Sequence, residues 1–285
     1  MQFAVGYQPR EDWIEAIVAR AASVHEVYFA YGTTPSGRKG VADVARQLDD
    51  LGQIADAGIG LNILYNANCY GARAQSRAFF NEIGETISRF SDGALTSVTT
   101  TSPLIAKFVK ANFPDLRVRA SVNMEIGTEE GMDYLADYFD GYYLKRELNR
   151  DLAAVRRVKA WCDARGKDLF ILANSGCLNN CSSHAFHDNL VAHEAEIAKE
   201  DNGFSFLGTC WHWLAKAENR AQWLSHTNWI APEDVARYEG LCTGMKLATR
   251  VNEHPTRILE SYVTGSHLGN MMELLEPNHS ALFRS

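Results

Sequence analysis

The chain has 285 residues, of which 46% are hydrophobic, and it carries a formal net charge of −7 with a pI near 5.7. This length allows a large core, in one large domain or two ordinary ones. The acidic balance gives no general attraction for nucleic acid or anionic membranes, so RNA is a disfavoured partner. We expect a cytoplasmic chain without a secretion signal or membrane span, since no apolar run approaches ~18 residues.

Short apolar segments alternate with longer amphipathic segments from the amino terminus onward. In chain order, the candidate strands are 3–6, 27–30, 61–65, 95–98, 118–121, 141–144, 169–173 and 245–248. Apolar residues three and four apart predict helices after several of them, around 13–21, 41–54 and 152–161. Alternation of this kind predicts parallel strands, because parallel neighbours need a crossover connection.

Eight strand–helix units fit the length of a (β/α)8 TIM-like barrel, and we predict this fold as a single domain over residues 1–285. An open doubly wound sheet is the alternative. The first strand is not followed by a Gly-x-Gly-x-x-Gly loop, so a dinucleotide-binding fold loses its main support.

Residues 174–241 are too many for an ordinary connection and form a predicted insertion after strand seven. Within it we expect helices near 185–199 and 232–239. In a barrel this insertion would cover the C-terminal face, where barrel active sites lie. Its tryptophans either form a lid over a cofactor or pack the insertion, and they are Trp211, Trp213, Trp223 and Trp229.

Four cysteines in the second half of the chain are candidate metal ligands. Cys177 and Cys181 lie in a polar loop after strand seven, Cys210 follows in the insertion, and Cys242 shortly precedes the last strand. Soft thiolates bind iron–sulfur clusters and zinc. One close pair and two single cysteines favour a 4Fe-4S cluster over a zinc site, which usually has two pairs. Cys69, at the end of strand three, is a possible substitute ligand for Cys210 or Cys242.

Charged residues at strand ends are the candidate catalytic and substrate-binding groups. Arg146 and Glu147 follow strand six, Lys246 and Arg250 lie on and after strand eight, and His184 follows the cysteine pair. An arginine at a barrel mouth can hold a carboxylate or phosphate at two points. A surface ion pair between Arg146 and Glu147 is the alternative.

Five segments resemble the collagenase-like family of peptidases of unknown catalytic type (family thirty-two). They span roughly residues 80 to 265, and they are 120–124, 143–148, 169–181, 229–234 and 246–250. The family's signature has His-Gly before its first cysteine, where this chain has Asn174 and Ser175. The resemblance implies a barrel with a four-iron cluster on Cys177, Cys181, Cys210 and Cys242. Several members are oxygen-independent hydroxylases acting on ubiquinone precursors or RNA, and peptidase is the older label.

We therefore expect an iron–sulfur enzyme that hydroxylates or otherwise modifies a small anionic molecule without oxygen. A zinc-dependent peptidase or hydrolase is one alternative. The other is a non-catalytic iron–sulfur partner of a paralogous barrel.

Overall fold

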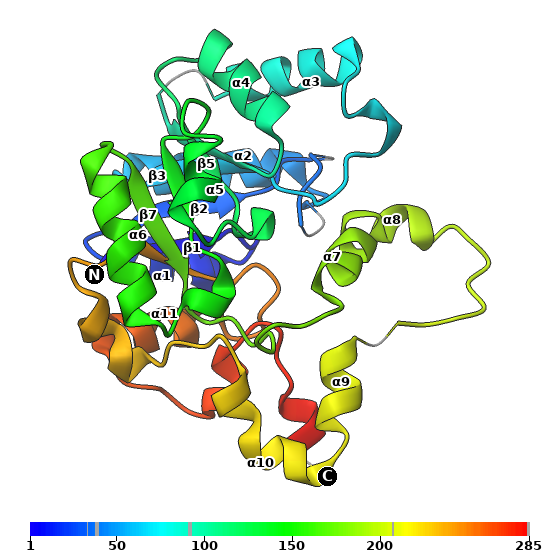
Figure 1. Cartoon of the computed structure of the whole chain (residues 1–285). Coiled ribbons are helices and arrows are strands. Elements are labelled where there is room, and N and C mark those ends of the chain that lie inside the picture. Colours follow the sequence, from blue (N-terminus) through cyan, green and yellow to red (C-terminus); the bar gives the residue numbers. More distant parts are fainter. Residues whose placement is uncertain (33, 38–39, 91–92, 207, 284–285) are drawn as a thin grey trace.

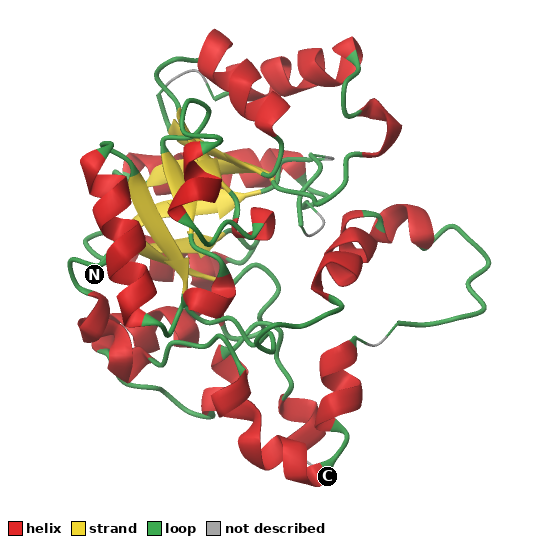
Figure 2. Ribbon diagram, viewed as in Figure 1, coloured by secondary structure: helices red, strands yellow, loops and turns green. Residues whose placement is uncertain are grey.

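Eight parallel strands close into a barrel in the order of the sequence, so the predicted (β/α)8 fold is confirmed. The computed structural model describes residues 1–32, 34–37, 40–90, 93–206 and 208–283. Each predicted strand overlaps an observed one (Figures 1 and 2). The strands are β1 Phe3–Gly6, β2 Val24–Phe29, β3 Gly60–Tyr65, β4 Leu95–Thr100, β5 Arg117–Ala120, β6 Gly141–Tyr143, β7 Asp168–Leu172 and β8 Gly244–Leu247.

Helices cover the outside of the barrel, and several of them begin at side-chain caps. Asp43 accepts a hydrogen bond from the Arg46 amide, Ser102 caps the Ile105 amide, and Asp151 caps two amides of the helix after β6. The outer helices are α1 Glu11–Ala19, α2 Val44–Asp56, α3 Arg77–Ser88, α4 Pro103–Asn112, α5 Glu129–Asp133, α6 Leu152–Ala164 and α11 Pro255–Thr264.

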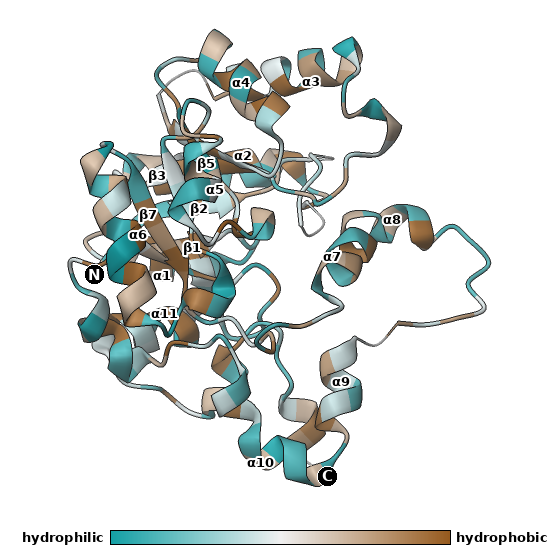
Figure 3. Ribbon diagram, in the orientation of Figure 1, coloured by the Kyte–Doolittle hydropathy of each residue, from teal (hydrophilic) through white to brown (hydrophobic). Residues whose placement is uncertain are grey.

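The main core lies between the outer surface of the strands and these helices. Alternate strand residues such as Val5, Val27 and Ile63 are fully buried there against the apolar stripes of the helices. Mixed teal and brown bands along α3 and α4 show this two-faced character (Figure 3). The other strand residues point into the barrel.

The barrel interior contains charge, which an apolar reading of the strands does not predict. Glu26 is 1% exposed and accepts hydrogen bonds from Asn62 at 2.7 Å, Ser97 at 2.8 Å and Arg119 at 2.5 Å. The β1–β2 register shifts so that consecutive residues of β1 pair with Val24 and Glu26. A shift of this kind re-aims side chains, and it turns Glu26 into the interior.

The connection between β7 and β8 carries four α-helices and the 3-10 helix η4 Pro232–Tyr238. Instead of one helix over 185–199, the chain forms α7 His184–Ala192 and α8 Glu194–Ile197, separated at His193. The predicted helix over 232–239 is the 3-10 turn. Two further helices, α9 Thr209–Leu214 and α10 Ala217–His226, were not predicted. In Figure 1 all four stand beside the barrel body.

The carboxyl-terminal segment packs against this connection (Figure 1). Its 3-10 helices, η5 Met271–Leu274 and η6 Ser280–Phe283, follow α11. Leu275 and Leu282 share a cluster with Trp223 and Trp229. Trp223 is 1% exposed and contacts the Phe283 ring, so these tryptophans form the core of the connection. Within the described residues, no helix is both long and apolar enough to cross a membrane.

Candidate functional site

A cavity of about 170 Å³ opens at the C-terminal end of the barrel strands. Its wall combines thiols from the β7–β8 connection with charged side chains from the strand ends. The predicted site residues on it are Arg146, Cys177, Cys181, His184, Cys210, Lys246 and Arg250. The fold therefore brings seven candidates, widely separated in sequence, to one place.

The loop that carries Cys177 is fixed on both sides by backbone hydrogen bonds. The Gly176 amide donates to the Glu276 carbonyl at 2.8 Å, and the Asn228 amide donates to the Cys177 carbonyl at 3.1 Å. A side chain at Gly176 would lie 2.4 Å from the Pro277 carbonyl oxygen, so only glycine fits there. The carboxyl-terminal segment thus holds the first cysteine in position.

Asn174, buried directly after β7, ties the same loop to the neighbouring segments. Its side chain accepts from the Ala248 amide at 2.6 Å and donates to the Leu274 carbonyl at 2.9 Å. The family that the sequence resembles has a different signature residue at this position. In this chain, the Asn174 side chain satisfies buried backbone groups.

Cys210 reaches the cysteine pair because the starts of α7 and α9 are linked. The Thr209 hydroxyl donates to the Ser183 hydroxyl at 2.6 Å, which sets the residue before Cys210 beside the loop of Cys181. Burial raises the pKa of the Cys210 thiol to about 11, and charge on Cys177 and Cys181 raises it further. A bound metal would supply the positive charge that stabilises the thiolate forms.

Cys242 does not join the other three, which corrects the predicted ligand set. It immediately precedes β8, and the adjacent Thr243 amide donates to the Leu169 carbonyl at the start of β7. Cys177 follows the end of β7, so these two thiols lie at opposite ends of the barrel. Cys242 is 8% exposed within the main core, and burial raises the pKa of its thiol to about 12.

Cys69 lies on the C-terminal side of β3, but it is not among the described residues that line the cavity. A hydrogen bond with His193, at the end of α7, lowers the pKa of the Cys69 thiol, and the Gly71 amide contributes further. Among the described residues, Cys69 therefore pairs with His193 and not with the three thiols of the cavity.

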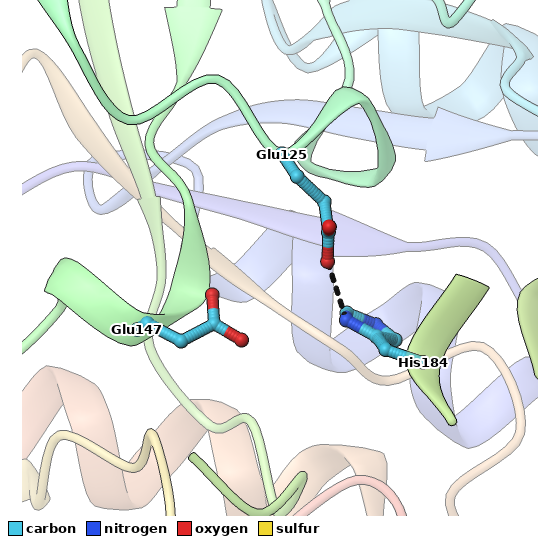
Figure 4. Close-up of side chains that lie close together, drawn as sticks. All are labelled: Glu125, Glu147 and His184. Carbon is cyan, nitrogen blue, oxygen red and sulfur yellow. Dashed lines mark ion pairs between the residues drawn. The ribbon is translucent and has the colours of Figure 1, made fainter. Parts of the chain in front are cut away.

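Arg146 is 7% exposed and stands at the centre of a polar network on the cavity wall. It donates to Asn123 Oδ1 at 2.7 Å and to Nε2 of His184, and it lies 3.9 Å from Asp188. His184 Nδ1 lies 2.5 Å from a carboxylate oxygen of Glu125 (Figure 4). The His184 imidazole thus lies between the Arg146 guanidinium and two carboxylates, because its Nε2 is also 3.3 Å from Asp188.

Glu147 faces the same imidazole from the other side (Figure 4). Ligand atoms of Glu125, Glu147 and His184 all lie within 4.8 Å of one another, a spacing found for this one group among the described residues. Glu147 Oε2 is buried without a hydrogen-bond partner there, and the Lys145 ammonium lies 4.0 Å away. Two carboxylates and one imidazole can hold a divalent cation, although the adjacent Arg146 opposes one electrostatically.

Lys246 is 7% exposed on β8, with its amine over the Tyr28 ring at 4.0 Å and 5.2 Å from the Tyr143 ring centre. Burial, followed by the nearby charges of Arg250 and Arg146, lowers the pKa of Lys246 to about 7. Arg250 donates to the Ser36 hydroxyl at 3.4 Å. The mouth therefore brings three basic side chains together, on a wall that also carries Asp188 and Glu276.

The other residues that line the cavity, none of them predicted as site residues, include Tyr28, His187 and Asp188. The spacing of four between His184 and Asp188 places both on one face of α7, and it is a signal that could have found Asp188. The four tryptophans of the connection are not among the described cavity-lining residues. Trp229 instead donates to the Tyr262 hydroxyl at 2.9 Å, so packing explains it better than a lid.

Comparison with solved structures supports the fold. The U32 peptidase Mk0906 is similar with a TM-score of 0.61 and 14% identity, over 86% of this chain and 91% of that chain. A family 39 glycoside hydrolase from Bacteroides cellulosilyticus WH2 overlaps with a TM-score of 0.43 and 11% identity, over 60% of this chain and 48% of that chain. No family model matches the sequence, and no curated protein matches it. The first similarity shows a U32-like barrel fold; the second carries no argument.

Proposed function

We propose that this chain is an iron–sulfur barrel enzyme that modifies a small anionic molecule at the barrel mouth. The observation that carries the proposal is the shared cavity wall of Cys177, Cys181 and Cys210, which come from two parts of the β7–β8 connection. Arg146, Lys246 and Arg250 lie on the same wall. Thiols beside cations suit a cluster that faces an anionic substrate.

The three thiols fit a cluster better than they fit a single zinc ion. Thiolates on one zinc ion, each about 2.3 Å from it, lie within about 4.6 Å of one another. Among the described residues, the group of ligand atoms gathered within 4.8 Å contains no thiol. Cysteines of a four-iron cluster bind separate irons and stand farther apart. We propose Cys177, Cys181 and Cys210 as ligands, without Cys242.

When bound, the cluster would supply one-electron redox chemistry, and oxygen-independent hydroxylation is the reaction we propose. The chain's own residues bind and orient the substrate. Arg250 and Arg146 hold its anionic group, and Asn123 keeps the Arg146 guanidinium aligned with a 2.7 Å hydrogen bond. His184 Nδ1 lies 2.5 Å from Glu125, which gives the mouth an acid–base pair.

Anaerobic purification with iron analysis tests this proposal. The protein should be brown, with about four irons per chain. Cys177→Ser, Cys181→Ser and Cys210→Ser should each lose most of the iron, whereas Cys242→Ser and Cys69→Ser should keep it. A colourless protein without iron would overturn the proposal, and iron loss confined to Cys69→Ser or Cys242→Ser would overturn the ligand set.

Metal-dependent hydrolysis is a second candidate, favoured by the Glu125, Glu147 and His184 group. It predicts one tightly bound zinc per chain, lost in Glu147→Gln, and peptide cleavage that a chelator stops. Glu129→Gln is the matched control, because Glu129 forms an exposed ion pair with Arg157. Absence of zinc from the purified protein would remove this candidate.

A non-catalytic role beside a paralogous barrel is tested by activity of the purified chain alone. Turnover by this chain without a second protein would exclude that role, whereas consistent co-purification of a second barrel would favour it.

A further inference from the structure

Lys246 is a buried amine that contacts no acidic partner among the described residues. Its side chain comes from β8, in the middle of the barrel, and is 7% exposed. Within the part of the chain that the structure describes, its amine contacts two aromatic rings and no carboxylate. Buried lysines normally pair with an acid, so this one stands out.

The charges around Lys246 disfavour the protonated form of its amine. Arg250 and Arg146 approach from the mouth, and Arg119 approaches from below. Glu26, an acid whose charge acts on Lys246, is already engaged by Asn62, Ser97 and Arg119. Tyr28 and Tyr143 complete the surroundings from β2 and β6. Burial first, and then these arginines, hold the pKa of Lys246 near 7, so a large share of the amine is neutral at neutral pH.

A neutral lysine amine that lines a cavity is a nucleophile toward carbonyl carbon. Desolvation and a neighbouring cation are two ways in which proteins activate lysine for this chemistry. The same cavity offers the guanidinium groups of Arg250 and Arg146, which recognise carboxylate. A cavity of about 170 Å³ suits a small molecule.

We propose that Lys246 forms an imine with the carbonyl group of a small 2-oxo acid whose carboxylate is held by Arg250 and Arg146. The amine nitrogen attacks the carbonyl carbon, and the carbonyl π electrons move to oxygen. One proton passes from nitrogen to that oxygen, which gives a carbinolamine. The second nitrogen proton then passes to the hydroxyl group, which leaves as water, and a C=N bond joins the substrate to Lys246. This chemistry shares the anion-binding mouth of the proposed function but uses none of its thiols.

Trapping with pyruvate and cyanoborohydride tests the proposal, because the borohydride delivers hydride to the C=N bond and fixes the adduct. Peptide mass spectrometry should place one reduced adduct per chain on Lys246 at pH 7. Lys246→Met and Lys246→Arg should lower labelling at least tenfold. Lys145→Met is the matched control, because this more exposed lysine at the end of β6 lies beside Arg146; it should label as wild type.

Arg250→Met should reduce labelling by pyruvate several-fold more than labelling by acetone, which lacks a carboxylate. Circular dichroism of each variant separates loss of the amine from loss of the fold. Adducts spread over surface lysines, with none on Lys246 in folded protein, would overturn the proposal. Equal labelling of Lys246→Arg would do the same.

The same trapping on iron-free protein separates this inference from the proposed function. Cys177→Ser should label as wild type does if the amine acts without the thiols. An iron-free wild type that still traps pyruvate would overturn the proposed cluster and support the imine. A brown protein that traps no pyruvate would support the cluster and overturn the imine.

Discussion

The barrel interior has two charged layers, and they differ in how completely the protein satisfies them. In the deep layer, Glu26 accepts hydrogen bonds from Asn62, Ser97 and Arg119. In the mouth layer, Lys246 meets aromatic rings, with Arg146 and Arg250 nearby. A balanced buried network maintains a structure by itself. A buried amine without a carboxylate partner is costly to the fold, and this cost is offset when an anion binds beside it.

The deep layer should dominate stability. Arg119→Met leaves Glu26 charged, buried and without its cationic partner, so we expect the free energy of unfolding to fall by about 3–5 kcal/mol. Chemical denaturation measures it. Arg117→Met, two residues earlier on β5, breaks an exposed ion pair with Asp168 and should change stability by about 1 kcal/mol or less. Equal effects of the two changes would show that burial does not distinguish them.

The mouth layer should behave in the opposite way. Lys246→Met removes an unpaired buried amine, so we expect the free energy of unfolding at pH 6 to rise by roughly 1–4 kcal/mol. The pKa of Lys246 is lowered to about 7 in the folded protein, so between about pH 7 and its ordinary value near 10 the unfolded chain holds the extra proton. Wild-type stability therefore rises with pH across that window, and the advantage of Lys246→Met should fade toward pH 10.

Lys167 provides the control for that pH series. Its amine donates to the Ala136 carbonyl at 2.6 Å and the Phe139 carbonyl at 2.7 Å. Lys167→Met leaves these two carbonyls unpaired and should cost about 1–3 kcal/mol at neutral pH. A stabilising Lys167→Met, or a destabilising Lys246→Met at pH 6, would contradict the difference between a partnered and an unpartnered amine.

Much of this architecture was predictable from the sequence. Strand–helix alternation gave the barrel, and position at a strand's carboxyl end placed Arg146 and Lys246 at its mouth. Strand direction also predicts that Cys242 lies apart from Cys177. A residue just before a parallel strand and a residue just after one lie at opposite ends of the barrel. The deep layer had a visible signal too, since Glu26 and Arg119 are charged residues within two strands of the barrel. A register shift, which depends on pairing, decides that Glu26 points inward.

The contacts that hold the cysteine loop, its frame, were not predictable from the sequence. Gly176 and Asn174 are held by residues about 100 positions later, in a segment without apolar periodicity. Local patterns contain no information about such contacts. The same holds for the link between Ser183 and Thr209, which brings Cys210 to the cysteine pair.

Asn174→Ala tests whether the mouth depends on this frame as well as on its charges. The change leaves the Ala248 amide and the Leu274 carbonyl without their buried partner, so we expect a loss of about 1–3 kcal/mol. The loop of Cys177 should loosen, and the iron content should fall below that of wild type. Asn112→Ala, which removes an exposed hydrogen bond to Phe108, should change neither quantity measurably. Iron retained in full by Asn174→Ala would show that the thiol loop holds its shape without this clamp.

The smallest expected effect concerns Tyr28, which links the two layers. Its hydroxyl donates to the Leu247 carbonyl at 2.8 Å, while its ring lies under the Lys246 amine. Tyr28→Phe keeps the ring and loses that bond, so we expect a cost of about 1 kcal/mol and an unchanged rate of imine trapping. Tyr238→Phe, which loses a buried bond to the Asn149 carbonyl, shows what such a loss does by itself. If trapping slows at least tenfold in Tyr28→Phe alone, the hydroxyl protonates the departing oxygen, and Tyr28 belongs to the reactive mouth as well as to its support.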